Sequence, residues 1–314
     1  MAQFPLKPHA ASSGADAPAF LAWSQSDIEN RCGFKGGRYT SVNHALAFLI
    51  GALLTGILYS LMLFVFSHLP VVSKVAVIYM RPTNQFAVIP ATFFFFGGMT
   101  ILFLKGKKIQ FQQRALTLGA VPAEPEFILT EATAATVLAR IYSLVDQPRH
   151  FVLLNRIDRA LSNFKNIGQV NDVSAILRAQ AENDEDQVAS SYTVVNGLVW
   201  AIPVLGFIGT VLGLSLAIGR FTQTLQAEGD LALIRASLQG VTGGLATAFE
   251  STLVALTFTL ILQLTITFQQ KREMAFLDEC NDYCHSHIVA KLRLTGRAAP
   301  APAATPHEQP APQP

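Results

Sequence analysis

Charged side chains are scarce in this sequence, and their scarcity excludes an ordinary pair of soluble domains. Asp, Glu, Lys and Arg make up 14% of the 314 residues, whereas soluble globular proteins carry about 25%. The net charge is only +2, and the basic residues form no stripe of the kind that binds nucleic acid. The composition therefore predicts a protein of another class, with no nucleic-acid partner.

The missing charge is concentrated in four long apolar stretches. Each has 19 to 35 residues, and the four together contain one charged side chain, Glu250. The stretches are 45–66, 86–104, 193–219 and 236–270. A helix needs about 20 apolar residues to cross the hydrocarbon layer of a bilayer. The sequence therefore predicts an all-α membrane protein with four transmembrane helices.

Basic residues indicate the orientation, because Lys and Arg are enriched in loops on the cytoplasmic side. Four spans place the N-terminal arm, the long central loop and the C-terminal part on one side, and these hold 19 Lys and Arg residues. The short loops on the other side, 67–85 and 220–235, hold four. We therefore expect both termini in the cytoplasm. The first stretch begins too far from the N-terminus for a signal peptide, so we interpret it as a span.

The sequence between the spans is expected to be helical, because no segment there alternates as a strand would. Thr130 is typical of a helix start, and residues 153–161 have amphipathic helical spacing. The acidic run 182–186 is interpreted as a solvated helix end, with a docking patch as the alternative. Residues 1–40 lack periodicity and predict a partly disordered arm. The predicted units are a cytoplasmic N-terminal arm (1–44), a transmembrane hairpin (45–104), a helical cytoplasmic domain (105–192), the third and fourth spans (193–270), a cytoplasmic helix (271–296) and a disordered Pro/Ala-rich tail (297–314).

Cysteine is also rare, with three copies at Cys32, Cys280 and Cys284. Disulfides are unusual in the cytoplasm, where these residues are expected. Cys280, Cys284, His285 and His287 form a CxxxCHxH cluster that zinc could occupy. A second ligand pair is missing nearby, and structural zinc sites usually have a tighter knuckle. We therefore favour a plain helix that continues out of the fourth span, and expect neither a metal site nor a cofactor.

The third apolar stretch carries small residues on one face, which suits close helix–helix packing. At about 100° per residue, Gly206, Gly209 and Gly213 share a narrow face with one hydroxyl group, that of Thr210. Packing accounts for the glycines but does not require the threonine. We assign Pro203 and the three glycines to helix packing and Thr210 to a candidate ion pathway.

The fourth stretch carries a stripe of small and polar residues that includes Thr252 and Thr259. Threonine hydroxyls that bond back to their own helix are one interpretation, and a wall facing an ion, water or another helix is the other. Counted at 1.5 Å per residue, Thr210 and Thr252 lie at the same depth, about 5 Å outside the membrane midplane. Thr247 lies slightly further out. The candidate ion-pathway residues are Thr210, Thr247 and Thr252, with Glu250, Ser251 and Thr259 as possible pathway or access residues.

Two segments of these stretches resemble the MotA/TolQ/ExbB proton-channel family. Residues 203–213, PVLGFIGTVLG, are similar to the signature of an earlier span, and residues 244–256, GLATAFESTLVAL, to that of the last span. In this resemblance Thr210 matches the pore threonine, and the motif selects Thr247 where the depth argument selects Thr252. ExbB-like members carry a Glu about five residues before that threonine, where this chain has Thr242.

The four-span layout is similar to MotA, since ExbB-like and TolQ-like proteins usually have three spans. The resemblance implies a stator subunit of a rotary motor in the bacterial inner membrane. It also implies a homopentamer around two single-span MotB/ExbD/TolR-like partner helices, each with a membrane-buried Asp. We favour H⁺ over Na⁺ as the transported ion, although hydroxyl groups suit either.

Two other functions compete with the motor subunit. One is a non-conducting scaffold or anchor of a related complex. The other is a transporter or membrane enzyme, which ranks last because the spans contain no metal-ligand set, phosphate loop or nucleophile–base pair. We therefore expect no catalytic residues.

Overall fold

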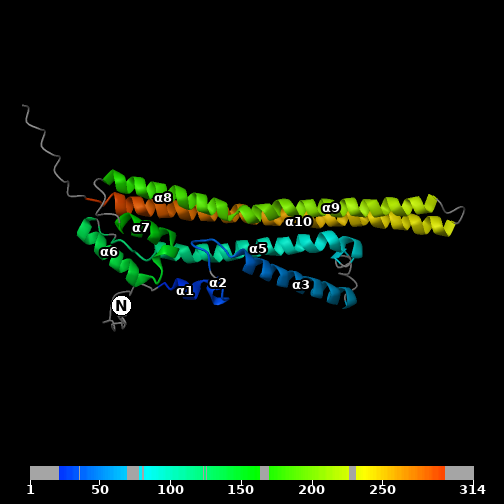
Figure 1. The fold of residues 1–314 in the computed structure, drawn as a ribbon, viewed down its shortest axis with the longest axis horizontal. Coiled ribbons are helices and arrows are strands. Elements are labelled where there is room, and N and C mark those ends of the chain that lie inside the picture. Colours follow the sequence, from blue (N-terminus) through cyan, green and yellow to red (C-terminus); the bar gives the residue numbers. More distant parts are fainter. Residues whose placement is uncertain are drawn as a thin grey trace, which may run out of the picture.

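The computed structural model describes residues 21–34, 36–68, 78–79, 81–122, 124, 126–162, 170–225 and 231–293. Helices account for the regular structure of these residues, apart from two isolated bridges. The long helices are α3 (His44–His68), α5 (Pro82–Leu116), α9 (Thr193–Leu225) and α10 (Leu231–Cys284), and they run along the long axis of the molecule (Figure 1). The predicted all-α class is confirmed.

Four helical segments are long and apolar enough to cross a membrane, as the sequence predicts. They are His44–Phe64, Gln85–Leu116, Asp172–Gly219 and Leu238–Val289. The helices extend beyond the predicted spans. α5 passes through the expected boundary at residue 104, and α10 has 54 residues, a length of about 80 Å. Hydropathy marks where apolar side chains end, whereas a helix continues until its backbone is capped or broken.

The three later long helices form the centre of the molecule, and α3 lies against α5. Glycine permits the close approach of α3 and α5, because a Cβ atom on Gly51 would lie 2.8 Å from the Cα atom of Gly97. Stacked rings of Phe95 and Phe258, with centroids 4.4 Å apart, join α5 to α10. α5 is therefore the helix that connects the outer α3 to the α9–α10 hairpin.

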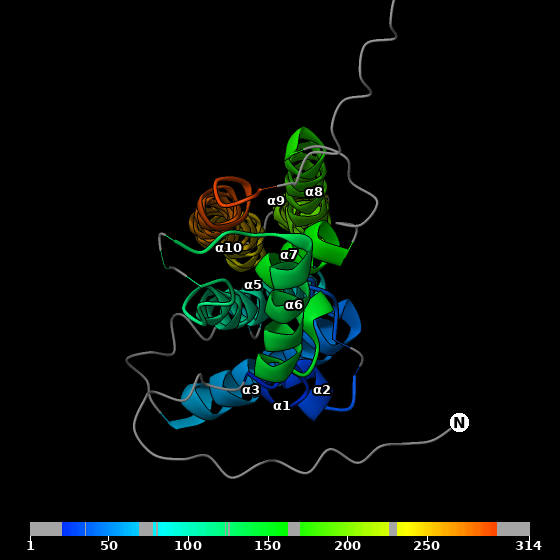
Figure 2. The same ribbon diagram turned by 90° about the vertical axis from the view of Figure 1, so that its left-hand side faces the viewer.

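A helical domain lies at one end of the long helices (Figures 1 and 2). It contains α6 (Glu131–Leu144), the short helix η1 (Pro148–His150), α7 (Val152–Ser162) and α8 (Val170–Ser191). Thr130 caps α6 as predicted, since its side chain accepts a hydrogen bond from the Thr133 amide. α7 is almost wholly buried, and α8 is separated from α9 by Tyr192 alone.

The acidic run 182–186 is not simply a solvated helix end. Asp184 is buried and accepts a 2.7 Å hydrogen bond from Arg156 Nε, whereas Glu182 is exposed. A buried guanidinium on α7 needs a carboxylate partner, and the helical face of α8 that meets α7 supplies one. The simple interpretation is therefore wrong for Asp184.

The described part of the N-terminal arm is folded. α1 (Trp23–Ser26) and α2 (Ile28–Arg31) pack against α5 and the helical domain. Trp23 is 2% exposed, its ring lies 5.4 Å from that of Phe151, and its amide donates to Asp146 at 2.7 Å. These residues show no helical or strand periodicity in the sequence, and they fold because contacts with distant residues hold them in place. Residues 1–20 and the predicted tail 297–314 lie outside the described residues.

Candidate ion pathway

Three glycines of α9 lie where α10 leaves no room for a side chain. A Cβ atom on Gly206 would lie 2.5 Å from the Cβ of Ala255, and one on Gly213 would lie 2.9 Å from the carbonyl oxygen of Gly244. Gly209 faces the Ser251 hydroxyl in the same way. Pro203 lies inside α9, one turn before this contact. The backbones of α9 and α10 therefore approach closely enough for short side chains to meet.

Thr210 and Thr252 are hydrogen-bonded to each other across this contact. Either hydroxyl can donate. Thr210 Oγ1 also lies 3.1 Å from the Ala248 carbonyl oxygen, and Thr252 Oγ1 lies 3.2 Å from that of Gly206. Both side chains are half-buried. The structure thus brings together the two threonines that the depth argument selects.

Thr247 lies on another side of α10, in a cluster with Glu250 and Arg81. Arg81 Nη1 lies 3.2 Å from Glu250 Oε2 and donates to Thr247 Oγ1, also at 3.2 Å. Thr247 is 3% exposed and donates in turn to the Gly243 carbonyl at 2.8 Å. Five residues separate Thr247 from Thr252, which is about 140° around the helix. The predicted threonines therefore belong to two clusters on different sides of α10.

Ser251 and Thr259 bond to their own helix. Ser251 is 1% exposed and donates to the Ala248 carbonyl at 3.0 Å, and Thr259 donates to the Ala255 carbonyl at 2.9 Å. Such bonds to the preceding turn are common for hydroxyl side chains in helices. Ser251 fills the interface with α9, and Thr259 lies about two turns deeper than Thr252.

Sequence reasoning missed Arg81 as a partner of the site. Arg81 is the N-cap residue of α5, and in the sequence it is only one of the few basic residues of a short loop. The available signal was Glu250, because a lone carboxylate within a span usually has a partner. The identity of that partner depends on how α5 packs against α10, which no local pattern specifies.

A buried ion pair lies at the other end of the predicted spans. Lys105 Nζ lies 3.3 Å from Glu273 Oε2, and the two side chains are 1% and 0% exposed. Glu273 also accepts hydrogen bonds from Tyr192, at 2.7 Å, and from Thr40. Lys105 donates to Ser191 at 2.7 Å. The pair joins α5, α10, the α8–α9 junction and the N-terminal segment at one point.

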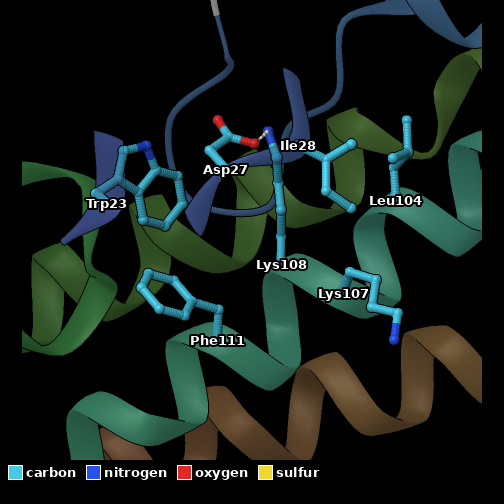
Figure 3. Close-up of a pocket in the computed structure, with 7 residues that line it drawn as sticks. All are labelled: Trp23, Asp27, Ile28, Leu104, Lys107, Lys108 and Phe111. Atoms are coloured by element: carbon cyan, nitrogen blue, oxygen red, sulfur yellow. Dashed lines mark ion pairs between the residues drawn. The ribbon is translucent and has the colours of Figure 1, made fainter. Parts of the chain in front are cut away.

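A second buried ion pair fixes the N-terminal segment to α5. Lys108 Nζ lies 2.7 Å from Glu29 Oε2 and 3.8 Å from Asp27 Oδ1. Figure 3 shows Lys108 reaching Asp27 beside the rings of Trp23 and Phe111. These residues line a cavity of about 30 Å³, enough for one or two waters. Burial raises the pKa of Asp27, although Lys108 opposes that shift.

The cysteines of the CxxxCHxH cluster are part of the hydrophobic core. Cys280 is 0% and Cys284 2% exposed, whereas His285 is exposed. His287 stacks on Tyr283, with ring centroids 4.3 Å apart. Within the described residues, no group of three or more His, Cys, Asp or Glu side chains is placed to hold a metal. The two cysteines pack into the core, and the chain continues past them as a short π-helix, His285–Val289.

Part of the chain is similar to a known protein family. Residues 145–279 match the family model described as the MotA/TolQ/ExbB proton channel family. This part of the chain is similar to the MotA/TolQ/ExbB family. The match covers α7, α8, α9 and most of α10, and so includes Thr210, Thr247 and Thr252. Arg81, Lys105 and Thr40 lie outside it. No curated protein and no solved structure matches the chain.

The four helices that are long and apolar enough to cross a membrane, together with the similarity of residues 145–279 to a proton-channel family, indicate a multi-pass membrane protein. The matched helices include α9 and α10, where the small residues and the paired threonines lie. The family match and the geometry therefore both include the α9–α10 hairpin.

Proposed function

We propose that this chain is the ion-channel (stator) subunit of a proton- or sodium-driven rotary motor. It would form a homopentamer in the bacterial inner membrane around a dimer of a single-span MotB/ExbD/TolR-like partner, and convert ion motive force into mechanical work. The observation that carries this proposal is the Thr210–Thr252 hydrogen bond between the two small-residue helices that match the family.

A hydroxyl pair suits an ion pathway whose charged group comes from another chain. Glu250 is the only charged side chain in the four apolar stretches, and its carboxylate forms an ion pair with Arg81. A membrane-buried Asp on the partner would therefore supply the carboxylate, and the hydroxyls would donate to it or accept from its proton. Each proton that crosses gains about 2.3 kcal/mol per 100 mV. The proposed ion is H⁺, with Na⁺ as the alternative.

The test replaces the hydroxyls while keeping the shape of the side chains. Thr210→Val with Thr252→Val is expected to leave the complex assembled and abolish ion-dependent work, measured as proton uptake by membrane vesicles. The matched control is Thr257→Val, because Thr257 is exposed on the same helix and bonds only its own turn. Unchanged proton uptake in the double variant would reject the pathway.

The non-conducting scaffold remains the alternative, because hydroxyls bonded to backbone carbonyls can also serve packing alone. The two functions differ in their need for an ion gradient. A motor subunit loses its activity when a protonophore dissipates the gradient, whereas a scaffold keeps it.

A further inference from the structure

A cavity of about 300 Å³ lies between α5 and α10, where two of the apolar stretches end. Its lining residues lie within 99–110 on α5 and within 265–272 on α10. The apolar stretches 86–104 and 236–270 both end inside these limits. A bilayer that covers the two stretches would therefore place the cavity at the boundary between its hydrocarbon core and its headgroups.

The two helices run in the same direction along this cavity. Phe95 stacks on Phe258, and a Cβ atom on Gly106 would lie 3.4 Å from Nε2 of Gln269. From the first contact to the second, the residue number rises by eleven on each helix (95 to 106 and 258 to 269). Residues that leave the apolar stretches of α5 and α10 therefore do so at the same end of the cavity.

The cavity has an apolar part and a cationic part at different depths. Met99, Leu102 and Phe103 line it within the apolar stretch, whereas Lys107 and Arg272 line it beyond the ends of the stretches. Met99 and Lys107 are eight residues apart, which is about 12 Å along the helix. Phe103 is 62% exposed, and both cations are exposed. A ligand here would meet apolar side chains at one end and positive charge at the other.

Gln269 lines the cavity with an amide group that lacks a hydrogen-bond partner. The residue is 8% exposed, and nothing among the described residues accepts a hydrogen bond from its Nε2 atom. A buried donor without an acceptor is costly. The described lining residues include no carboxylate, and Glu273, which follows Arg272, is paired with Lys105. The polar end of the cavity is therefore suited to an anion with acceptor oxygens.

We propose that this cavity binds an anionic phospholipid from the leaflet on the side of the helical domain. The phosphate accepts hydrogen bonds from Lys107, Arg272 and Gln269, and an acyl chain lies along Met99 and Phe103. Basic pockets between membrane helices suit anionic headgroups, which are abundant in the cytoplasmic leaflet. The apolar part of the cavity favours a lipid over a free phosphate. The site is separate from the Thr210–Thr252 pair, so the inference goes beyond the proposed function and does not depend on it.

The experiment counts the lipids bound to the full chain by native mass spectrometry while phosphatidylglycerol is titrated into the detergent solution. Lys107→Gln and Arg272→Gln are each expected to weaken binding roughly fivefold, and the two together about 25-fold. Gln269→Leu, which removes the amide and keeps the bulk, should weaken it on the order of tenfold. The matched control is Lys271→Gln, because Lys271 is an exposed cation beside Arg272 that does not line the cavity. Its binding should equal that of wild type.

Two competitors identify the part of the lipid that is recognised. Phosphatidylethanolamine has no net charge, and glycerol 3-phosphate has no acyl chain, so both should displace phosphatidylglycerol poorly. Efficient displacement by glycerol 3-phosphate would show a simple anion site and overturn the lipid assignment. An equal loss of binding in Lys271→Gln and Arg272→Gln would overturn it too, because the attraction would then come from general surface charge.

A second copy of the chain is the competing occupant of this cavity. Contact between subunits there predicts that the double variant Lys107→Gln with Arg272→Gln changes the oligomeric state, which the same spectra report as the mass of the complex. A changed mass with unchanged phosphatidylglycerol binding would replace the lipid site by an interface between copies. The lipid site instead predicts the same mass and weaker lipid binding.

Discussion

Single residues carry much of the organisation of this protein, and Lys105 and Glu273 show it most clearly. Their side chains are 1% and 0% exposed and 3.3 Å apart. Burying two charges is costly, and the cost is offset only when the remaining hydrogen-bonding groups are also satisfied. Here those groups are satisfied by hydrogen bonds with Tyr192, Ser191 and Thr40. Such a pair contributes more to the choice of one arrangement of helices than to total stability.

Removal of one partner of this pair should therefore be strongly destabilising. Lys105→Met leaves Glu273 buried without its cation, and we expect a loss of about 3–5 kcal/mol in the free energy of unfolding, measured by denaturant titration in detergent. The control is Lys107→Met, because Lys107 is exposed two residues along the same helix. The double variant Lys105→Met with Glu273→Leu should lose less free energy of unfolding than Lys105→Met alone, because it leaves no buried charge without a partner. An equal loss from both lysine substitutions would contradict the argument.

The sequence predicts residues of the site well where one helix alone decides their position. The angular positions of Gly206, Gly213 and Thr210 follow from helix geometry, and counting residues from the midplane selects Thr252 as the partner of Thr210. The partners of Thr247 and Glu250 could not be predicted, because Arg81 lies 166 residues from Thr247 in the sequence. Contacts of that kind depend on the packing of whole helices, which hydropathy does not specify.

At the scale of elements, the main difference from the predictions concerns the ends of helices and the N-terminal segment. Apolar composition identifies the four spans but not the continuation of α10 to Cys284. The segment from Trp23 to Asn43 has two short helices and no periodic pattern. It is held by contacts with distant residues, namely Lys108 at 2.7 Å from Glu29 and the rings of Phe111 and Phe151 around Trp23.

The docking of the N-terminal segment should weaken as the pH falls. Burial, together with the charge of Arg38, lowers the pKa of His150, whose ring lies 5.4 Å from that of Trp23. A lowered folded-state pKa means that this stabilisation is present above about pH 6.5 and is lost as the pH falls through the folded value. The protection of the amides of residues 23–31 against hydrogen exchange, corrected for the intrinsic pH dependence of exchange, should therefore be severalfold lower near pH 5 than at neutral pH.

Substitution of the imidazole isolates this effect. His150→Phe keeps the aromatic contact with Trp23 and should reduce the pH dependence of amide protection in residues 23–31. His285→Phe, at an exposed position, should leave that pH dependence unchanged. The other charged groups that act on His150 are Asp146, Asp27 and Lys108. The raised pKa of Asp27 acts in the opposite sense, because its protonation stabilises the folded state. A pH dependence unchanged in His150→Phe would assign the effect to another group.

At the scale of the whole molecule, the long helices separate two unequal ends. The helical domain and the N-terminal segment gather at one end, and the end of α9 and the beginning of α10 lie at the other (Figure 1). The end with the helical domain contains both buried lysine–carboxylate pairs. Because positively charged segments are retained on the cytoplasmic side, we expect the domain end to lie in the cytoplasm and the beginning of α10 to lie on the outer side.

The three cysteines provide a direct test of this orientation. Cys32 is exposed in the N-terminal segment, whereas Cys280 and Cys284 are buried, so a membrane-impermeant maleimide should label intact protein only at Cys32. In right-side-out spheroplasts we expect no labelling until the membrane is permeabilised. Arg235→Cys in a Cys32→Ser background should give the reverse, with labelling from outside, because residue 235 lies near the start of α10. Labelling of Cys32 in intact spheroplasts would show that the topology is the reverse of the one expected. Ions entering from outside would then reach Thr247 and the Thr210–Thr252 pair from the opposite end of the spans.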